Sequence, residues 1–359
     1  MNILQVIPTF GMGGAETMCA GLCRQLRAMG HTVTAVSLSG DKTSLTRLLE
    51  ESDVPVRYLN KSLGMDLGCV GRLKKVIVET NPQVIHTHLH ALKYAALAFP
   101  KVPIVHTVHN QADKEAVFLD QQIAKRLFQS RKAVPVALTK EIQQSIARLY
   151  RLEEAEIPLV TNGIDLSRCQ AKSEYTLHYP IEIVHVGRFF PQKNHGCILS
   201  ALALLKKRGI SVRLHCCGDG PLLEETKERS KALGLENQIV FEGIVEDVYP
   251  KLSQADLFIL PSSWEGMPMS IIEAMGSGLP VVASRVGGIP DMVADGESGL
   301  LIDPTPLALA DAIERLAKDE ALRQRLGTQA METAQRFSLS AMAQGYFNLY
   351  ETLLQGERL

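Results

Sequence analysis

Short apolar segments alternate with amphipathic ones along almost the whole chain, and this alternation limits the folds open to it. Segments such as Val212–Cys217 are typical of buried strands, whereas Leu67–Thr80 has the spacing of an amphipathic helix. Strands that alternate with helices form parallel sheets with helices on both faces. Because 359 residues exceed what one core usually serves, the sequence predicts an α/β protein of two domains.

The expected elements form two series. In the first, the strands are 2–7, 32–37, 54–59, 84–88, 103–109 and 134–138, with helices at 15–29, 67–80, 91–99, 115–131 and 140–150. In the second, the strands are 181–187, 212–217, 238–242, 257–260 and 281–283, with helices at 196–208, 222–233, 246–254, from about 270, at 306–318, 320–336 and 339–354. A polar, poorly periodic stretch from Asn162 to Pro180 separates them. We therefore expect domains at 1–165 and 166–338, with a C-terminal helix at 339–359.

The composition is that of an ordinary globular protein, with 46% hydrophobic residues and a net charge of −1. This charge argues against wholesale binding to nucleic acid. The N-terminus lacks the pattern of a signal peptide, and no apolar run approaches a membrane span. The seven cysteines are scattered without a metal-type C-x-x-C, which predicts free core thiols in a reducing cytoplasm.

A glycine-rich turn, Thr9–Glu16, follows the first strand. Its pattern Gly11-x-Gly13-x-x-Glu16 resembles a dinucleotide fingerprint, but Glu16 stands where that fingerprint needs Gly or Ala. The alternatives are a simple tight turn, or a loop whose backbone approaches a phosphate or a sugar.

Histidines gather at the ends of two expected strands. His86, His88 and His90 alternate, so a metal site on one strand face is conceivable, although no matching cysteine or carboxylate cluster accompanies them. His88 and His109 both fall at carboxyl strand ends, where ligands of parallel sheets collect. A structural role is the alternative for both, and it is favoured for His86 and His106.

The segment from Gln121 to Arg151 is strongly basic. It holds one acid, Glu141, and seven bases, which are Lys125, Arg126, Arg131, Lys132, Lys140, Arg148 and Arg151. A solvated helical face would explain this pattern. A surface that attracts anionic lipid or an anionic acceptor would also explain it.

The stretch from Leu257 to Ser284 has the organisation of a ligand site, because an apolar strand, a loop with Pro and Gly, a helix and a second apolar strand follow one another. Two carboxylates, Glu265 and Glu273, flank the expected helix start. Such a helix start at a carboxyl sheet edge favours an anion. Ser270-x-x-Glu273 also matches a capping box, which would give Glu273 a purely structural role.

Two further loops of the second series suit a diphosphate. Arg188 and Lys193 lie between a strand and a helix, where a guanidinium fork and a point charge could bind phosphate oxygens. The segment Gly218-Asp219-Gly220-Pro221 lets the backbone pass close to a ligand.

These motifs together resemble a known family. Their order along the chain is Gly13-Gly14-Ala15-Glu16, Asn162-Gly163-Ile164-Asp165, Val186-Gly187-Arg188 with Lys193-Asn194-His195, Gly218-Asp219-Gly220-Pro221 and Glu265-Gly266-x-Pro268-x₄-Glu273-Ala274. The sequence is similar to the bacterial retaining glycosyltransferases of family four, also called group 1, over nearly its whole length. The resemblance implies a GT-B fold, in which two Rossmann-like doubly wound parallel-sheet domains face each other across a cleft.

The resemblance also assigns roles to residues of the second domain, which would hold the nucleotide-sugar. Arg188 and Lys193 would bind the donor diphosphate, and Glu273 would accept hydrogen bonds from the ribose hydroxyls. Glu265 would contact the transferred sugar. Backbone groups would complete the donor site at Gly218, at Gly243–Glu246 beside the base, and at Gly266, Met267, Pro268, Met269 and Ser270 beside the phosphates.

In the first domain, the resemblance implies an acceptor site and part of the catalytic centre. Gly13 and Gly14 would bring backbone to the diphosphate, and His109 would lie beside the donor sugar as a catalytic residue with Glu265, Arg188 and Lys193. Glu16 and His88 would lie on the acceptor side. The helix 339–359 would cross back to the first domain.

The function implied is metal-independent, retaining transfer of a hexose or N-acetylhexosamine from an NDP-sugar, with UDP the favoured carrier. The chain has no D-x-D motif for a metal, and we expect no cofactor. The expected acceptor is a glycan or lipid-linked compound of bacterial envelope polysaccharide or lipopolysaccharide synthesis, at the inner face of the plasma membrane.

Four alternatives compete with this function. One is a UDP-sugar 2-epimerase of the same architecture, and another is a sugar-nucleotide-binding protein without catalysis. A pyridoxal-phosphate phosphorylase is disfavoured by the chain length, and a dinucleotide dehydrogenase by Glu16.

Overall fold

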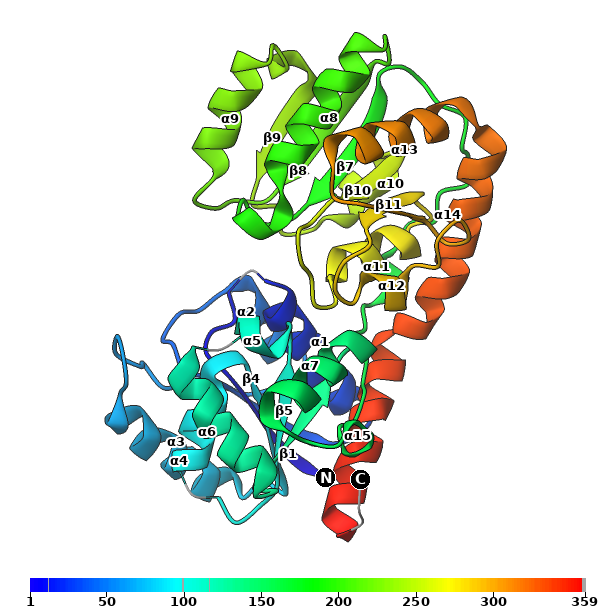
Figure 1. Cartoon of the computed structure of the whole chain (residues 1–359). Helices are drawn as coiled ribbons and strands as arrows, with labels where there is room; N and C mark the ends of the chain where they lie inside the picture. The colour runs from blue at the N-terminus through cyan, green and yellow to red at the C-terminus, as the bar shows by residue number, and fades with distance from the viewer. Residues whose placement is uncertain (12, 99, 116, 357–359) are drawn as a thin grey trace. The chain divides into compact units, whose positions relative to one another are not determined.

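A computed structural model describes residues 1–11, 13–98, 100–115 and 117–356 of the chain (Figure 1). The chain divides into unit 1, which comprises Met1–Ile164 and Ser338–Leu359, and unit 2, which comprises Asp165–Phe337. Residues 12, 99 and 116, which belong to the expected glycine-rich turn and to two expected helices, lie outside the described residues, as do residues 357–359 of the expected C-terminal helix.

Unit 1 contains a parallel six-stranded sheet in the order β3-β2-β1-β4-β5-β6. The strands are β1 Asn2–Ile7, β2 Thr32–Ser37, β3 Val56–Tyr58, β4 Val84–His88, β5 Ile104–Val108 and β6 Ala133–Ala137. This order is that of a doubly wound sheet, which reverses direction beside β1. β4 and β5 are buried along their whole length. Their burial explains why the sequence predicts both as strands although they contain histidines.

The helices of unit 1 cover both faces of this sheet. They are α1 Gly14–Ala28, α2 Ser44–Glu51, α3 Leu67–Thr80, α4 Leu92–Leu97, α5 Ala112–Glu115, α6 Phe118–Gln129, α7 Lys140–Tyr150 and α15 Leu339–Gln355, with 3-10 turns η1 Leu89–Ala91 and η2 Glu154–Glu156. α1 packs against α2 and α15, whereas α4 packs against α3 and α6, and α6 against α7. Right-handed crossovers on the two sides of β1 place these groups on opposite faces.

Unit 2 repeats this organisation with the strand order β12-β11-β10-β7-β8-β9. Its strands are β7 Ile181–Val186, β8 Val212–Cys217, β9 Ile239–Gly243, β10 Leu257–Leu260, β11 Val281–Ser284 and β12 Leu300–Ile302. Its helices are α8 His195–Lys207, α9 Leu223–Ala232, α10 Tyr249–Gln254, α11 Met269–Gly276, α12 Ile289–Met292, α13 Pro306–Lys318 and α14 Glu320–Ala334, with 3-10 turns at Leu166–Arg168, Pro191–Lys193, Glu236–Gln238 and Gln335–Phe337. α13 packs on α8 and α14 packs on α11 (Figure 1).

Besides the 3-10 turns, four described elements were absent from the sequence prediction: α2, α5, α12 and β12. α2 begins with a capping box in which Thr43 and Thr46 bond each other's backbone amides. The usual capping-box signature has Glu or Gln at the third helical position. Because Thr46 occupies that position here, the sequence prediction missed this helix start. α12 and β12 are only four and three residues long, too short for a periodic signal.

Candidate functional site

In unit 2, the loops that follow β7, β8 and β9 are joined at the carboxyl edge of the sheet. The Gly187 amide donates to Cys217 O at 2.9 Å, and the Gly218 amide donates to Gly243 O at 2.7 Å. Gly218 has φ +146°, and a Cβ there would lie 2.1 Å from Gly187 O. Only glycine therefore lets these two loops approach so closely.

Glu265 lies at this edge, in the loop after β10, and is almost fully buried. Its Oε1 accepts from Lys193 Nζ at 2.5 Å and from Ser262 Oγ at 2.6 Å, and its Oε2 accepts from Gln192 Nε2 at 3.1 Å. A buried carboxylate is tolerated when it is paired and hydrogen-bonded in this way. The side chain is therefore fixed in one orientation before any ligand arrives.

Arg188 differs from Lys193 in its surroundings. It is exposed, and its guanidinium carbon lies 5.9 Å from the ring centroid of Phe190. No carboxylate of the described part of the chain forms an ion pair with it. Arg188 thus presents an uncompensated positive charge at the same edge as the Lys193–Glu265 pair.

The capping-box interpretation of Ser270 and Glu273 is wrong. α11 begins at Met269 with Pro268 as its N-cap, and no side chain caps it. Ser270 is therefore the second helical residue, and Glu273 lies one turn inside the helix, too far along to reach the first amides. Because the first-turn N–H groups of a helix lack intrahelical acceptors, the start of α11 remains able to bind an anion.

Glu273 occupies a different environment from Glu265. No hydrogen bond to its carboxylate is found among the described residues. Burial raises the pKa of Glu273 to about 7, which Arg168 opposes and Asp247 reinforces. Arg168 itself pairs with Asp247 at 3.1 Å and lies over the ring of Tyr249. A half-buried carboxylate with unfilled acceptor positions is suited to a ligand that brings hydroxyl donors.

In unit 1, His88 ends β4 and His109 follows β5, and their side chains contact each other. His88 Nδ1 lies 3.1 Å from His109 Nε2, and His88 Nε2 lies 2.9 Å from Gln5 Oε1. Gln5 in turn donates to the Tyr350 hydroxyl at 3.3 Å. Because the amide oxygen of Gln5 can only accept, His88 carries its proton on Nε2 and accepts at Nδ1 from His109. A chain of hydrogen bonds from α15 thus orients His109.

The other histidines have structural partners. His86 bonds Tyr350 and Thr107 at 2.7 Å each, and His106 bonds Thr87 at 2.9 Å. His90 lies on η1, so the three alternating histidines do not continue along one strand. Within the described residues, no group of three or more His, Cys, Asp and Glu side chains is arranged to hold a metal.

Of the two glycines before Ala15, Gly13 is extended rather than left-handed, and Gly14 is the first residue of α1. Gly13 is the N-cap of α1 with φ −166° and ψ 165°, and it caps the helix without a side chain. A Cβ on Gly13 would lie 2.4 Å from Glu16 Oε2, so the carboxylate of Glu16 closes over this glycine. The backbone angles of Gly13 are open to any residue, so its conformation does not require glycine.

The basic segment lies on α6, α7 and the connections beside them. Arg131 pairs with Glu156 at 2.6 Å, which neutralises one of its charges. Three large apolar side chains directly before it, Val117, Phe118 and Leu119, are exposed by 66%, 74% and 68%. None of the described helices is long and apolar enough to cross a membrane.

Comparison with known proteins identifies the family. The family described as Glycosyl transferases group 1 matches residues 172–333, and that described as Glycosyltransferase Family 4 matches residues 12–168. A D-inositol 3-phosphate glycosyltransferase of Corynebacterium glutamicum is 30% identical over 72% of this chain and 69% of its own length. The chain belongs to the group 1, family 4 glycosyltransferases.

Other relatives of this glycosyltransferase extend over its whole length. The N-acetyl-alpha-D-glucosaminyl L-malate synthase of Bacillus anthracis is 25% identical over 97% of this chain and 96% of its own. The crystal structure of Anabaena HepE in complex with UDP and glucose has a TM-score of 0.86 and 22% identity, covering 98% of this chain and 100% of that one. The protein is therefore a transferase with the GT-B fold.

Several residues of the candidate site were not found from the sequence. Gln192 and Ser262 hold Glu265, while Arg168, Asp247 and Tyr249 surround Glu273. Ser262 could have been noticed, because it lies three residues before Glu265 in the same loop. Arg168 and Asp247 are far apart in sequence, and only the fold brings them together.

Proposed function

We propose that this glycosyltransferase takes a sugar from an NDP-sugar, with uridine as the base, without a metal ion and with retention of anomeric configuration. The observation that carries the proposal is the cluster at the carboxyl edge of unit 2. There Lys193 and Ser262 hold Glu265, Arg188 is unpaired among the described residues, and α11 begins without a side-chain cap. The likeness to HepE, which was crystallised in complex with UDP and glucose, supports the choice of donor.

The proposed donor contacts follow from charge and hydrogen-bonding capacity. Arg188, Lys193 and the first amides of α11, with Gly266–Ser270, bind the diphosphate. Glu273 accepts from the ribose hydroxyls, and Glu265 accepts from a hydroxyl of the sugar through the unfilled side of Oε2. Gly218 and Gly243 bring backbone close to the nucleotide. In unit 1, Gly13, Gly14, Glu16, His88 and His109 keep the roles that the resemblance implies.

The chemistry requires stabilisation of a departing nucleoside diphosphate while positive charge develops on the sugar. Fixed cations and helix amides aimed at the leaving group supply this stabilisation. Glu265 already accepts three hydrogen bonds, from Lys193, Ser262 and Gln192, so it is held in place rather than free to attack. We therefore assign Glu265 to orienting the sugar and stabilising its charge, with the acceptor hydroxyl attacking on the leaving-group face.

For the acceptor, we propose a glycan or lipid-linked compound of bacterial envelope synthesis. The basic segment at 121–151 and the exposed residues Val117, Phe118 and Leu119 support an anionic membrane surface as the place of reaction. Apolar side chains beside basic ones combine insertion with electrostatic attraction, which is how interfacial segments bind lipid.

A nucleotide panel tests the donor. A ligand present at 100 times its Kd adds about 2.7 kcal/mol to stability, so UDP should raise the thermal midpoint of the protein more than GDP or ADP at equal concentration. Equal or absent shifts with all three would contradict a uridine donor.

Product analysis then separates transfer from epimerisation. Without an acceptor, the transferase should leave a UDP-sugar intact or hydrolyse it slowly, whereas an epimerase would convert it to a second UDP-sugar. NMR of the product anomer tests retention, and full activity after exhaustive chelation tests metal independence. An inverted anomer would overturn retention. Activity that returns only with a divalent cation would overturn metal independence.

A further inference from the structure

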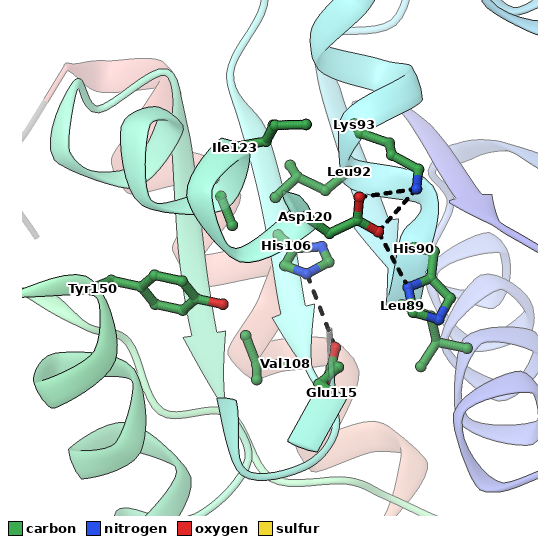
Figure 2. Close-up of a pocket in the computed structure, with 11 residues that line it drawn as sticks. Leu89, His90, Leu92, Lys93, His106, Val108, Glu115, Asp120, Ile123 and Tyr150 are labelled. Carbon is green, nitrogen blue, oxygen red and sulfur yellow. Dashed lines mark hydrogen bonds and ion pairs between the residues drawn. The ribbon is translucent and has the colours of Figure 1, made fainter. Parts of the chain in front are cut away.

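A small cavity lies in unit 1, and all of its lining residues belong to that unit. It lies on the sheet face that α4, α6 and α7 cover, near the carboxyl end of β5 (Figure 2). Its volume is about 30 Å³. A buried water needs about 10–15 Å³ by this kind of measure, so the cavity has room for two waters or one hydroxyl with its carbon.

The first polar group of the cavity is the ring of His106 on β5. Thr87 Oγ1 donates to Val105 O at 3.1 Å, so toward His106 Nδ1, at 2.9 Å, it can only accept. Nδ1 therefore carries the proton, and Nε2 presents a lone pair. Burial lowers the pKa of His106 to about 4, which keeps the ring neutral at physiological pH.

The second polar group is Glu115 at the end of α5, whose side chain is only 7% exposed. Its Oε2 accepts from the Asn110 amide at 2.8 Å, whereas its buried Oε1 has no hydrogen-bond partner among the described residues. Burial raises the pKa of Glu115 to about 8, against the lowering effect of the Asn110 and His109 amides. At pH 7 the carboxyl group is therefore protonated, and Oε1 can donate.

These two groups face each other without touching. Glu115 Oε1 and His106 Nε2 are 4.0 Å apart, which is too long for a hydrogen bond. One oxygen atom placed about 2.8 Å from each could form a hydrogen bond with both groups. That oxygen must accept from Glu115 and donate to His106. A hydroxyl does both, whereas a carboxylate or phosphate oxygen cannot donate and an ammonium group cannot accept.

The walls of the cavity suit the carbon atom that bears such a hydroxyl. Leu89, Leu92 and Ile123 supply apolar walls, and Tyr150 from α7 points its hydroxyl into the cavity (Figure 2). Toward solvent, Lys93 binds both oxygens of Asp120 at 2.9 and 2.8 Å. Apolar walls with paired donors and acceptors at the rim are the features that a sugar or polyol requires, since its CH groups and hydroxyls alternate.

We propose that this cavity binds a hydroxyl group of a neutral sugar or polyol, with Glu115 as donor and His106 as acceptor. The proposal does not depend on the identity of the donor nucleotide. If the proposed transferase activity holds, the bound polyol is part of an acceptor.

The hydrogen-bond pattern makes binding depend on pH in a defined direction. When Glu115 ionises, it loses the proton that it donates. Its carboxylate oxygen then faces the ligand oxygen, and both atoms can only accept on that side. The other titratable groups around Glu115 are His106 and His109 at β5, Tyr150 on α7, Asp120 on α6, Lys93 on α4 and His90 on η1. Burial lowers the pKa of His109 to about 3 and raises that of Tyr150, so neither changes charge between pH 6.5 and 9.

The test uses the full chain with glycerol, myo-inositol and methyl α-glucopyranoside as probes, followed by ligand-observed NMR titration. With the wild type, the Kd of the best probe should rise about tenfold between pH 6.5 and pH 9, because about one tenth of Glu115 remains protonated at the higher pH. E115Q should bind equally at both pH values, since its amide donates like the protonated acid but cannot ionise. E153Q, which changes an exposed glutamate, is the matched control and should behave as the wild type.

Three outcomes would overturn the proposal. The first is that no probe binds to the wild type at pH 6.5, which would leave the cavity a water site. The others are pH-independent binding by the wild type and the same pH-dependence in E115Q. Titration of UDP into the same samples is a separate readout. Its failure would count against the proposed donor site and not against this cavity.

Discussion

At the scale of single residues, the carboxylates of Glu265 and Glu273 differ in what they require from a ligand. Lys193 serves two partners under our proposal, because it holds Glu265 and faces the diphosphate. K193A should therefore lower turnover by about 10²-fold or more, and E273A by a similar factor, while far-UV circular dichroism remains unchanged. The exposed residues Lys231 and Glu228 provide matched controls, and K231A and E228A should keep normal turnover. Near-normal activity in both K193A and E273A would remove the donor-site assignment.

Glu273 also predicts a pH-dependence of donor binding. Its pKa of about 7 means that it is mostly protonated at pH 6 and mostly ionised at pH 8. Only the ionised form accepts freely from two ribose hydroxyls, so the affinity for a UDP-sugar should increase roughly tenfold over this range. Calorimetric titration at several pH values measures this. E273Q should bind weakly with little pH-dependence, and an unchanged pH profile in that variant would assign the effect to another group.

At the scale of elements, the sequence predicted most strands and helices because burial and period coincide in them. Val84–His88 and Leu67–Thr80 match the structure at both ends. The prediction failed where the local signal was ambiguous. Ser270-x-x-Glu273 has the letters of a capping box, yet the helix begins at Met269, and its N-cap is Pro268, two residues before Ser270.

The candidate site was predictable only where its residues are close in sequence. The pair His88 and His109 could be anticipated, because the carboxyl ends of neighbouring parallel strands meet. Glu115 could not, since its chemistry depends on a cavity formed by β5, α6 and α7. The partners of Glu273 could not either, because Arg168 and Asp247 approach it only through the tertiary fold.

The C-terminal helix α15 gives a prediction of its own, because its tyrosines hydrogen-bond with the sheet. The Tyr350 hydroxyl lies 2.7 Å from His86 Nδ1 and accepts from Gln5. Y350F would leave both buried groups without this partner and should reduce the free energy of unfolding by about 1–3 kcal/mol. Urea unfolding measures the loss. The control N348A changes an exposed residue of the same helix and should stay within about 0.5 kcal/mol of the wild type.

At the scale of the whole molecule, a net charge of −1 gives no general attraction to an anionic surface, so any such attraction must be local. Vesicles with phosphatidylglycerol should bind the protein at low salt and release it near 0.5 M salt, because the Debye length then falls to a few ångströms. K125E/R126E should weaken binding, as two charges near the surface contribute about 1 kcal/mol each.

The apolar residues distinguish insertion from attraction alone. F118S/L119S should lower vesicle binding and leave its salt-dependence unchanged, since the basic side chains remain. The control K207E/K231E changes two lysines of unit 2 by the same total charge and should bind like the wild type, because the proposed attraction comes from the segment at 121–151. Equal losses in K207E/K231E and K125E/R126E would mean that net charge, and not the segment at 121–151, governs the attraction. Binding that does not depend on lipid charge would contradict the proposed membrane surface. The acceptor would then be a freely diffusing compound.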